Sequence, residues 1–417
     1  MHTAGAGSMN SRMQLGAIWL WVAVLSLSPL TRAVAQDEEA KRKAGLDFYG
    51  FVMVDAIFDH TGIKGDWLGA ARPTQLPAFE DEFGPPGQFY FGVKQTRFGV
   101  KAHAPSKLGE VTAVIDFDFF GTGVDAGQTT LRLRHAYIEL GQFLMGQTES
   151  PFMDLDIFPN ELDYWGPNGM VFFRNVQFRW TPIQGDNVLE FALERPGASG
   201  DQGSYVDRIE LTDVVARFPV PDFSAAFKWG GHDWGYLRLA GMLRYIKWDD
   251  LGNQPFDLAG DAVGWGLNLS SNVKTDSKGV LRLSAMYGAG VENYMNDAPV
   301  DIGIENNFSD PLQPIVGTAL PVYGLVAFYD RTWNEKWSST IGWSMISIEN
   351  SDGQLPSAFH QGQYALVNLL FYPIPGMMFG PELQYIHRTN FSDGWDTGGF
   401  RLQVSGKYNF AASIGGK

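Results

Sequence analysis

Residues 400–410 read Phe-Arg-Leu-Gln-Val-Ser-Gly-Lys-Tyr-Asn-Phe, a stretch in which apolar and polar side chains alternate. Because successive side chains of a β-strand point to opposite faces, this stretch predicts a strand with one apolar and one polar face. The same alternation recurs in residues 48–58, 111–119 and 223–229. Apolar faces of this length suit tilted strands that cross a lipid bilayer. The sequence therefore predicts strands with one side in lipid and the other in water.

Short turns and long loops separate the predicted strands, and the long loops span residues 62–87, 150–170, 197–222 and 293–320. Short turns on one rim and long loops on the other are typical of an outer-membrane barrel. The strands of secreted β-sandwiches and propellers also alternate apolar and polar residues, but loops of about twenty residues are uncommon in compact soluble domains. We therefore expect an all-β fold, a transmembrane antiparallel β-barrel of about 16 strands with short periplasmic turns and long extracellular loops.

The loop at residues 150–170 is expected to fold into the lumen of this barrel. It is rich in large apolar residues, namely Phe152, Leu155, Ile157, Phe158, Leu162 and Trp165. A long loop with so many apolar side chains would otherwise expose them to water, so burial against the inner wall is favoured.

The N-terminus has the pattern of an export signal. Arg12 precedes an apolar run at residues 15–25, and the small residues Ala33-Val-Ala35 follow it. This order is typical of a secretory signal peptide, and the run is too short for a membrane-spanning helix. We expect residues 1–35 to form the signal peptide and residues 36–45 a short periplasmic segment. The barrel would then occupy residues 46–410, with a C-terminal tail at residues 411–417.

The composition excludes several function classes. The chain has 417 residues, no cysteine and a formal net charge of −15 at pH 7. The lack of cysteine excludes a disulfide scaffold, a thiolate metal site and a cysteine nucleophile. The acidic balance argues against a nucleic-acid partner, whose phosphates require a basic surface.

No motif in the sequence indicates an enzyme. The patterns of the serine-hydrolase elbow, the zinc protease helix, the P-loop and the dinucleotide fold are all missing. The seven histidines are scattered without metal-ligand spacing. We therefore expect no catalytic residue, no metal site and no cofactor.

Several motifs resemble one family of porins. The segment Thr96-Arg-Phe-Gly-Val-Lys101 resembles the second-strand motif of trimeric Gram-negative porins. Leu131-Arg-Leu-Arg-His-Ala-Tyr137 and Met145-Gly-Gln-Thr-Glu-Ser-Pro-Phe152 resemble the strands that lead into the third loop of those proteins. The chain is similar to the DcaP-like porins over residues 46–410, and the motifs that narrow the resemblance are Phe158-Pro-Asn160, Tyr164-Trp-Gly-Pro-Asn-Gly169 and residues 262–269.

This resemblance implies a homotrimer of such barrels in the Gram-negative outer membrane, in contact with lipid and lipopolysaccharide. It also implies a third loop that narrows each pore and the uptake of small, often anionic, organic solutes. The small residues at 264–271 favour close packing of neighbouring walls, in agreement with a trimer. Two features depart from the family, because seven residues follow the last-strand aromatic Phe410 and the segment before the barrel is short.

The polar faces of the strands predict a basic lumen. If the apolar residues meet lipid, the residues that alternate with them line the pore. The basic ones are Arg97, Lys101, Arg132, Arg134, Arg179, Lys228, Arg238, Arg244, Arg282, Arg388, Arg401 and Lys407, and the acidic ones are Asp47, Asp55, Asp59, Asp116, Asp118, Glu190, Glu194 and Glu382. Basic residues are thus in excess on the wall of an acidic protein.

The candidate selectivity site lies where this wall faces the third loop. Its expected pore-lining residues are Arg97, Lys101, Arg132, Arg134, Arg179, Asp116 and Asp118. The expected acids of the constriction loop are Asp154, Asp156, Glu161 and Asp163. Fixed charges on the two sides of a constriction create a field that selects permeating ions. Wall arginines favour anions, whereas loop acids that reach the constriction would favour cations.

The sequence therefore predicts a passive porin for small hydrophilic solutes of the carboxylate type. A channel with a saturable site at the constriction differs from this only in whether one solute blocks its current. A barrel hydrolase would need a reactive constellation on one strand, and a plugged structural barrel would need bulk in the lumen. The small inward residues Gly264, Gly266, Asn268, Ser270, Gly342 and Ser344 argue against such a plug.

Overall fold

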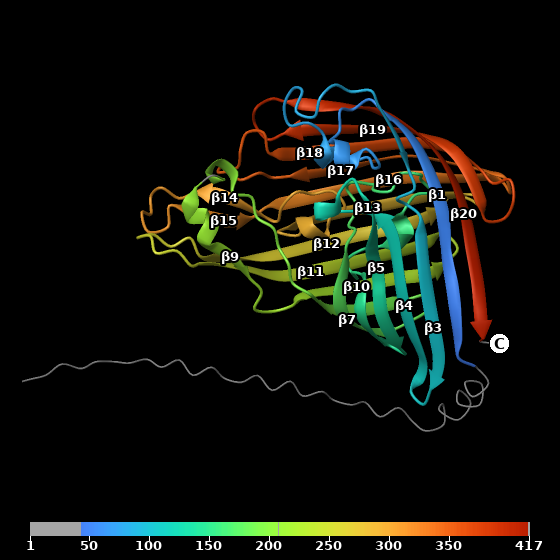
Figure 1. The fold of residues 1–417 in the computed structure, drawn as a ribbon. Helices are drawn as coiled ribbons and strands as arrows, with labels where there is room; N and C mark the ends of the chain where they lie inside the picture. Colours follow the sequence, from blue (N-terminus) through green and yellow to red (C-terminus); the bar gives the residue numbers. More distant parts are fainter. Residues whose placement is uncertain (1–42, 207, 416–417) are drawn as a thin grey trace, which may run out of the picture. The chain divides into compact units, whose positions relative to one another are not determined.

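The computed structural model describes residues 43–206 and 208–415, and in these residues 16 antiparallel strands form one closed barrel. Each strand pairs with its neighbours in the chain. The first strand, β1, pairs with both β3 and the last strand, β20, and so closes the ring. Figure 1 shows this closure, with β1 in blue beside β20 in red. The predicted fold class is confirmed.

The barrel strands are seven to twenty residues long. They are β1 (Gly45–Asp59), β3 (Arg97–Ser106), β4 (Gly109–Phe120), β5 (Thr129–Leu140), β6 (Phe143–Glu149), β7 (Arg174–Ile183), β8 (Val188–Glu194), β10 (Asp222–His232), β11 (Gly235–Asp250), β12 (Gly260–Lys274), β13 (Gly279–Ala289), β16 (Pro321–Asn334), β17 (Trp337–Ile348), β18 (Phe359–Phe371), β19 (Met377–Asn390) and β20 (Asp396–Gly415).

Four further strands and seven short 3₁₀ helices occur in the described part of the loops. The strands are β2 (Gln88–Gly92), β9 (Val214–Arg217), β14 (Ile302–Asn306) and β15 (Ile315–Ala319). The helices are η1 (Gly65–Trp67), η2 (Pro73–Gln75), η3 (Gly123–Asp125), η4 (Leu155–Ile157), η5 (Gly203–Tyr205), η6 (Ile209–Asp213) and η7 (Glu292–Tyr294). None of these helices is long and apolar enough to cross a membrane.

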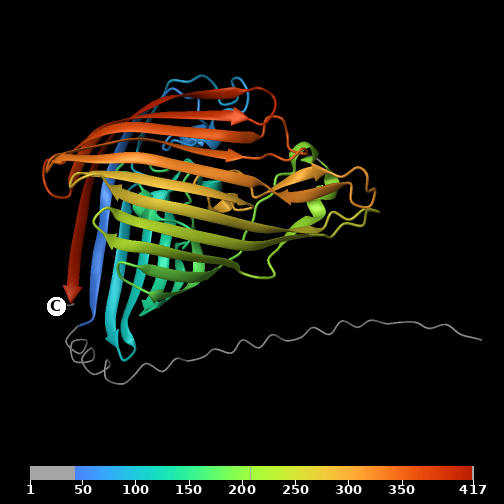
Figure 2. The ribbon, with the colours of Figure 1, turned by 180° about the vertical axis from the view of Figure 1, so that it is seen from behind.

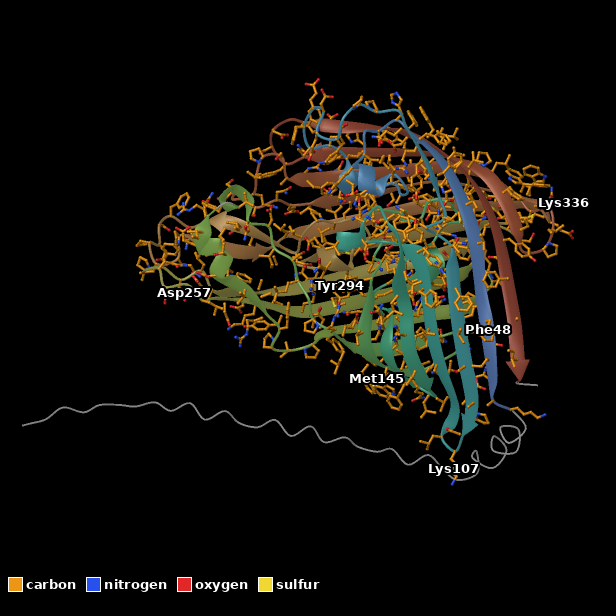
Figure 3. All side chains as sticks on the ribbon, viewed as in Figure 1. Phe48, Lys107, Met145, Asp257, Tyr294 and Lys336 are labelled. Carbon is orange, nitrogen blue, oxygen red and sulfur yellow. The ribbon has the colours of Figure 1, made fainter. Side chains whose placement is uncertain are left out.

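Short and long connections alternate around the barrel, as the sequence predicts. Lys107 and Lys336 mark two of the short turns, and Asp257 lies in a loop at the opposite end (Figure 3). We number the connections at the rim opposite the short turns in chain order. The first loop is residues 60–96, the third loop residues 150–173, and the sixth loop residues 290–320. The third loop is three residues longer than the sequence predicts, because β7 begins only at Arg174.

The two faces of each strand divide as expected. On β1, Val52 and Val54 are about half exposed on the outer face, whereas Asp55 and Asp59 are buried on the inner face. The outer face continues in leucines, valines and aromatic rings on every neighbouring strand. In lipid this surface would be solvated by acyl chains, so its exposure in the barrel alone is not a cost.

The hydrophobic core lies inside the barrel. Parts of the first, third and sixth loops pack there against the inner wall of β10 to β19, the strands that face the viewer in Figure 2. Tyr294 of the sixth loop is 1% exposed and lies between the walls (Figure 3). Packed loops therefore fill the part of the lumen beside these strands.

The small residues of β12 serve the third loop. Gly266 faces inward, and a Cβ atom there would lie 2.8 Å from Cζ of Phe152. Asn268 donates to the carbonyl of Phe152, and Ser270 donates to the carboxylate of Asp154. The interpretation of residues 264–271 as a close-packing surface between neighbouring walls is therefore wrong for these inward residues, because they make room for the loop.

The end of the chain is part of the barrel. β20 runs through Gly415, which pairs with Gly45, so residues 411–415 lie in the last strand and Phe410 is not its end. The predicted signal peptide and most of the predicted periplasmic segment fall outside the described residues.

Candidate functional site

The third loop is fixed to the inner wall at its first turn. The side chain of Asp154 accepts a hydrogen bond from its own loop, at the backbone N–H of Asp156. It also accepts from the hydroxyls of Tyr236 on β11 and Ser270 on β12, at 2.7 and 2.5 Å. Phe152, Ile157 and Leu162 are fully buried, whereas Leu155 is 47% exposed. The loop thus lies in the lumen, as predicted, but the predicted burial of Leu155 is wrong.

A second attachment holds the tip of the loop. Glu382 of β19 is fully buried and accepts hydrogen bonds from the backbone N–H groups of Leu162 and Asp163, at 2.8 and 3.0 Å. The amides of Asn368 and Gln384 donate to the same carboxylate. A wall carboxylate that the sequence assigned to the lumen surface is therefore an anchor for the loop.

Contacts with the first and sixth loops also hold the third loop in place. Arg72 of the first loop lies against the rings of both Trp67 and Trp165, with its guanidinium carbon 4.1 and 4.5 Å from the ring centroids. Arg72 also pairs with Asp297 of the sixth loop at 2.8 Å. Cation–π contacts of this kind stabilise most when they are desolvated. The three loops therefore form one unit inside the barrel.

A cavity of about 270 Å³ remains between this unit and the wall of β3 to β7. Four arginines line it, Arg97, Arg132, Arg134 and Arg174, and we call it the arginine cavity. Its other lining residues are Gln95, Leu155, Phe158, Pro159, Glu161, Asp163, Tyr164, Trp165, Phe172 and Asn296. The structure thus brings together three of the predicted basic residues and two of the predicted loop acids.

Two of these arginines are held by acids behind them. Arg132 pairs with Asp118 at 2.9 Å, and Arg134 pairs with Asp116 at 3.0 Å and with Asp118 at 3.2 Å. Both acids are on β4 and almost fully buried. Tyr164 of the third loop contacts both arginines and donates to Asp118. Asp116 and Asp118 therefore position the guanidinium groups rather than lining the cavity themselves.

Arg97 differs from its neighbours because it has no ion pair among the described residues. Its Nε atom also has no hydrogen-bond partner there, and its guanidinium carbon lies 5.2 Å from the ring of Phe51. A guanidinium stays charged at any ordinary pH. Arg97 therefore brings a positive charge to the cavity without a direct ion pair among the described residues.

Arg174 is a site residue that the sequence pattern did not predict. It is the first residue of β7, directly after the third loop, and pairs with Glu149 at 3.2 Å. Glu149 is the last residue before that loop, and it also lies 3.1 Å from His135. The sequence does contain a signal for Arg174, because Glu149 and Arg174 carry opposite charges at the two ends of the third loop. Strands joined by a loop place their ends opposite each other, so such a pair is expected to meet.

Burial opposes the charged form of the two loop acids that line the arginine cavity. Burial raises the pKa of Glu161 well above its ordinary value, and the nearby carboxylates of Glu382 and Asp163 raise it further. Glu161 is thus favoured in its neutral form, with the Tyr364 hydroxyl donating to it at 3.2 Å. Burial also raises the pKa of Asp163, which accepts from the backbone N–H groups of Ala71, Trp165 and Gly166.

The remaining predicted residues lie elsewhere. Arg179, Asp154 and Asp156 line a second cavity of about 190 Å³, together with Glu149, Ser150, Met153, Leu155, Val188, Glu190, Lys228 and Arg238. Arg179 pairs there with Glu190 at 3.3 Å, and Lys228 pairs with Asp156 at 2.5 Å. Lys101 is an exposed residue farther along β3 and lines neither cavity.

The groups around the arginine cavity combine hydrogen-bond donors with aromatic rings. Fixed guanidinium groups replace part of the hydration shell of a carboxylate, and the rings of Phe158 and Phe172 offer apolar contact beside them. Within residues 43–206 and 208–415, no group of three histidine or acidic side chains is arranged to hold a metal ion.

Comparison with known proteins agrees with this architecture. The family model described as DcaP outer membrane protein matches residues 24–410. The crystal structure of the outer membrane channel DcaP of Acinetobacter baumannii is 20% identical, covers 88% of this chain and 98% of its own, and superposes with a TM-score of 0.72. No curated protein matches the chain.

Two more distant structures share the fold alone. The anion-selective porin of Comamonas acidovorans is 8% identical with a TM-score of 0.56, over 88% of this chain and 100% of its own. The trimer form of OmpT from Vibrio cholerae is 10% identical with a TM-score of 0.52, over the same shares of the two chains. The family match covers almost the whole barrel, and the chain therefore belongs to the DcaP outer membrane protein family.

Proposed function

We propose that this protein is a passive, non-catalytic channel that prefers small anionic solutes of the carboxylate type. The observation that carries the proposal is the convergence of Arg97, Arg132, Arg134 and Arg174 on one cavity beside the third loop. Three of these arginines have acidic partners, and Arg97 has none among the described residues. The direct ion pairs therefore leave one of the four guanidinium groups, that of Arg97, without a carboxylate partner among the described residues.

The physical basis is the difference between buried and exposed charges. Salt screens exposed charges beyond about 8 Å at physiological ionic strength, so acids on the outer loops act weakly on a distant ion. Charges inside a narrow cavity with protein walls are screened much less. An anion at the third loop therefore responds to the arginines rather than to the net charge of the protein.

The sign of ion selectivity in planar bilayers tests this proposal. With purified protein and a tenfold gradient of potassium chloride, the reversal potential is expected to have the sign of chloride preference. Strong cation preference in the wild-type channel would contradict the proposal. Current that saturates with one added carboxylate would instead favour the substrate-specific form of the channel, with the arginine cavity as its binding site.

We further propose that the functional unit is a homotrimer, with lipid and lipopolysaccharide around its outer surface. An apolar groove on the outer wall supports a protein contact there, and it is lined by residues of β1, β19 and β20 that include Val52, Val54, Phe379 and Tyr408. A trimeric state is also named for the Vibrio cholerae relative.

Native mass measurement in detergent tests the oligomeric state. We expect a mass of three chains in mild detergent, and a compact band on unboiled gels that moves to the monomer position after heating. A single-chain mass across several mild detergents would contradict the trimer and leave the barrel unaffected.

A further inference from the structure

The two cavities beside the third loop lie in series along β7. The arginine cavity includes Arg174, the first residue of β7, and the second cavity includes Arg179, five positions farther toward the short-turn rim. At about 3.3 Å per residue, these positions are roughly 16 Å apart along the strand. The loop core fills the part of the lumen beside β10 to β19. A solute that crosses the barrel on the open side therefore meets the two cavities one after the other.

Leu155 of the third loop lines both cavities. It belongs to the wall of the arginine cavity and to that of the second cavity. It is 47% exposed, whereas Ile157 in the same turn is fully buried. An apolar side chain therefore lies between two compartments whose other walls carry arginine, lysine and carboxylate groups.

The position of Leu155 is fixed by its neighbours. Asp154 before it is tied to Tyr236 and Ser270. After it, the Asp156 side chain pairs with Lys228, and the Asp156 carbonyl accepts from Asn272 and Arg282. The turn is thus attached to β10, β11, β12 and β13, which leaves Leu155 little freedom to move aside.

We infer that Leu155 is a specificity-determining residue, an apolar gate between the two polar cavities of the pore. This inference rests on the proposed channel function. It adds apolar contact to charge as a property by which the pore selects solutes. A fully hydrated inorganic ion must pass an apolar constriction at the cost of part of its hydration. An organic anion can instead lay its hydrocarbon part against Leu155 while its carboxylate stays with an arginine. The gate therefore favours carboxylates with a longer hydrocarbon body.

The test compares Leu155→Ala and Leu155→Asn with the wild type in planar bilayers. Asparagine is close to leucine in size, so this variant separates polarity from width. The probes are chloride, acetate and hexanoate, each as its potassium salt. Leu133→Ala is the matched control, because Leu133 is also 47% exposed but lies on the lipid-facing side of β5.

We expect both Leu155 variants to conduct more chloride than the wild type. We also expect the permeability of hexanoate relative to acetate to fall by about fourfold to fifteenfold, the effect of one or two methylene groups that lose apolar contact. Leu133→Ala should leave both quantities unchanged. If the Leu155 variants match Leu133→Ala in both quantities, Leu155 is not a gate. If the wild type forms no channel at all, the proposed function fails instead.

Discussion

Replacing Arg97 by glutamate is expected to change the channel from anion preference to cation preference. At an effective dielectric constant of about 20, a unit charge about 8 Å from an ion acts on it with roughly 2 kcal/mol before screening. Arg97→Glu changes the cavity by two charges, so the ratio of anion to cation permeability should fall more than about tenfold. Arg97→Gln, which removes one charge, should give an intermediate value. Both are measured from reversal potentials in a salt gradient.

Arg97 is the best position for this test because its removal leaves no acid without a partner. Arg134→Ala would leave the buried Asp116 and Asp118 short of a counter-ion, and breaking such a pair costs about 3–5 kcal/mol. The matched control is Lys101→Gln, which removes a charge from the same strand outside the arginine cavity. If Arg97→Gln and Lys101→Gln shift the reversal potential equally, the selectivity comes from the general charge of the wall.

Replacing Glu382 by alanine is expected to release the tip of the third loop. The change leaves four donors without their acceptor, the backbone N–H groups of Leu162 and Asp163 and the amides of Asn368 and Gln384. Each unsatisfied buried donor costs about 1–3 kcal/mol, so the folded loop should lose at least about 3 kcal/mol. We expect a larger and noisier single-channel current and a lower midpoint of thermal unfolding in detergent.

Two further variants serve as controls for Glu382→Ala. Leu383→Ala changes the neighbouring residue, which faces lipid on the same strand, and should leave the current unchanged. Glu382→Gln keeps one carbonyl oxygen as an acceptor and should have a smaller effect than alanine. A Glu382→Ala channel with wild-type current and noise would show that the third loop is held without this carboxylate.

The strand alternation made the barrel predictable from the sequence. Once residues 400–410 and their counterparts are taken as strands, the inner and outer faces follow from the two-residue period. The inward direction of Arg97, Arg132 and Arg134 is part of that pattern. The inward fold of the third loop was also predictable, because residues such as Phe152 and Ile157 require burial.

The periodicity could not show which inward charges meet water. Arg401 points inward as predicted, yet it is fully buried, pairs with Asp59 and donates to the carbonyls of Leu68 and Ala70 in the first loop. Arg244 is buried in the same way between Asp222 and Asp301. A two-residue period gives the side of a wall, whereas the packing of loops against that wall depends on contacts between residues far apart in the chain. The position of Arg174 in the cavity and the anchoring role of Glu382 are of this kind.

The most direct test of an anion path through the arginine cavity uses the lack of cysteine in the chain. Phe158 lines the arginine cavity, so Phe158→Cys places a unique thiol at the proposed anion path. Anionic and cationic methanethiosulfonate reagents of similar size are then added to single channels in a bilayer. If anions pass the four arginines, the anionic reagent reacts several times faster and each reaction reduces the current in a step. Reaction without a change of current, or faster reaction of the cationic reagent, would contradict this path.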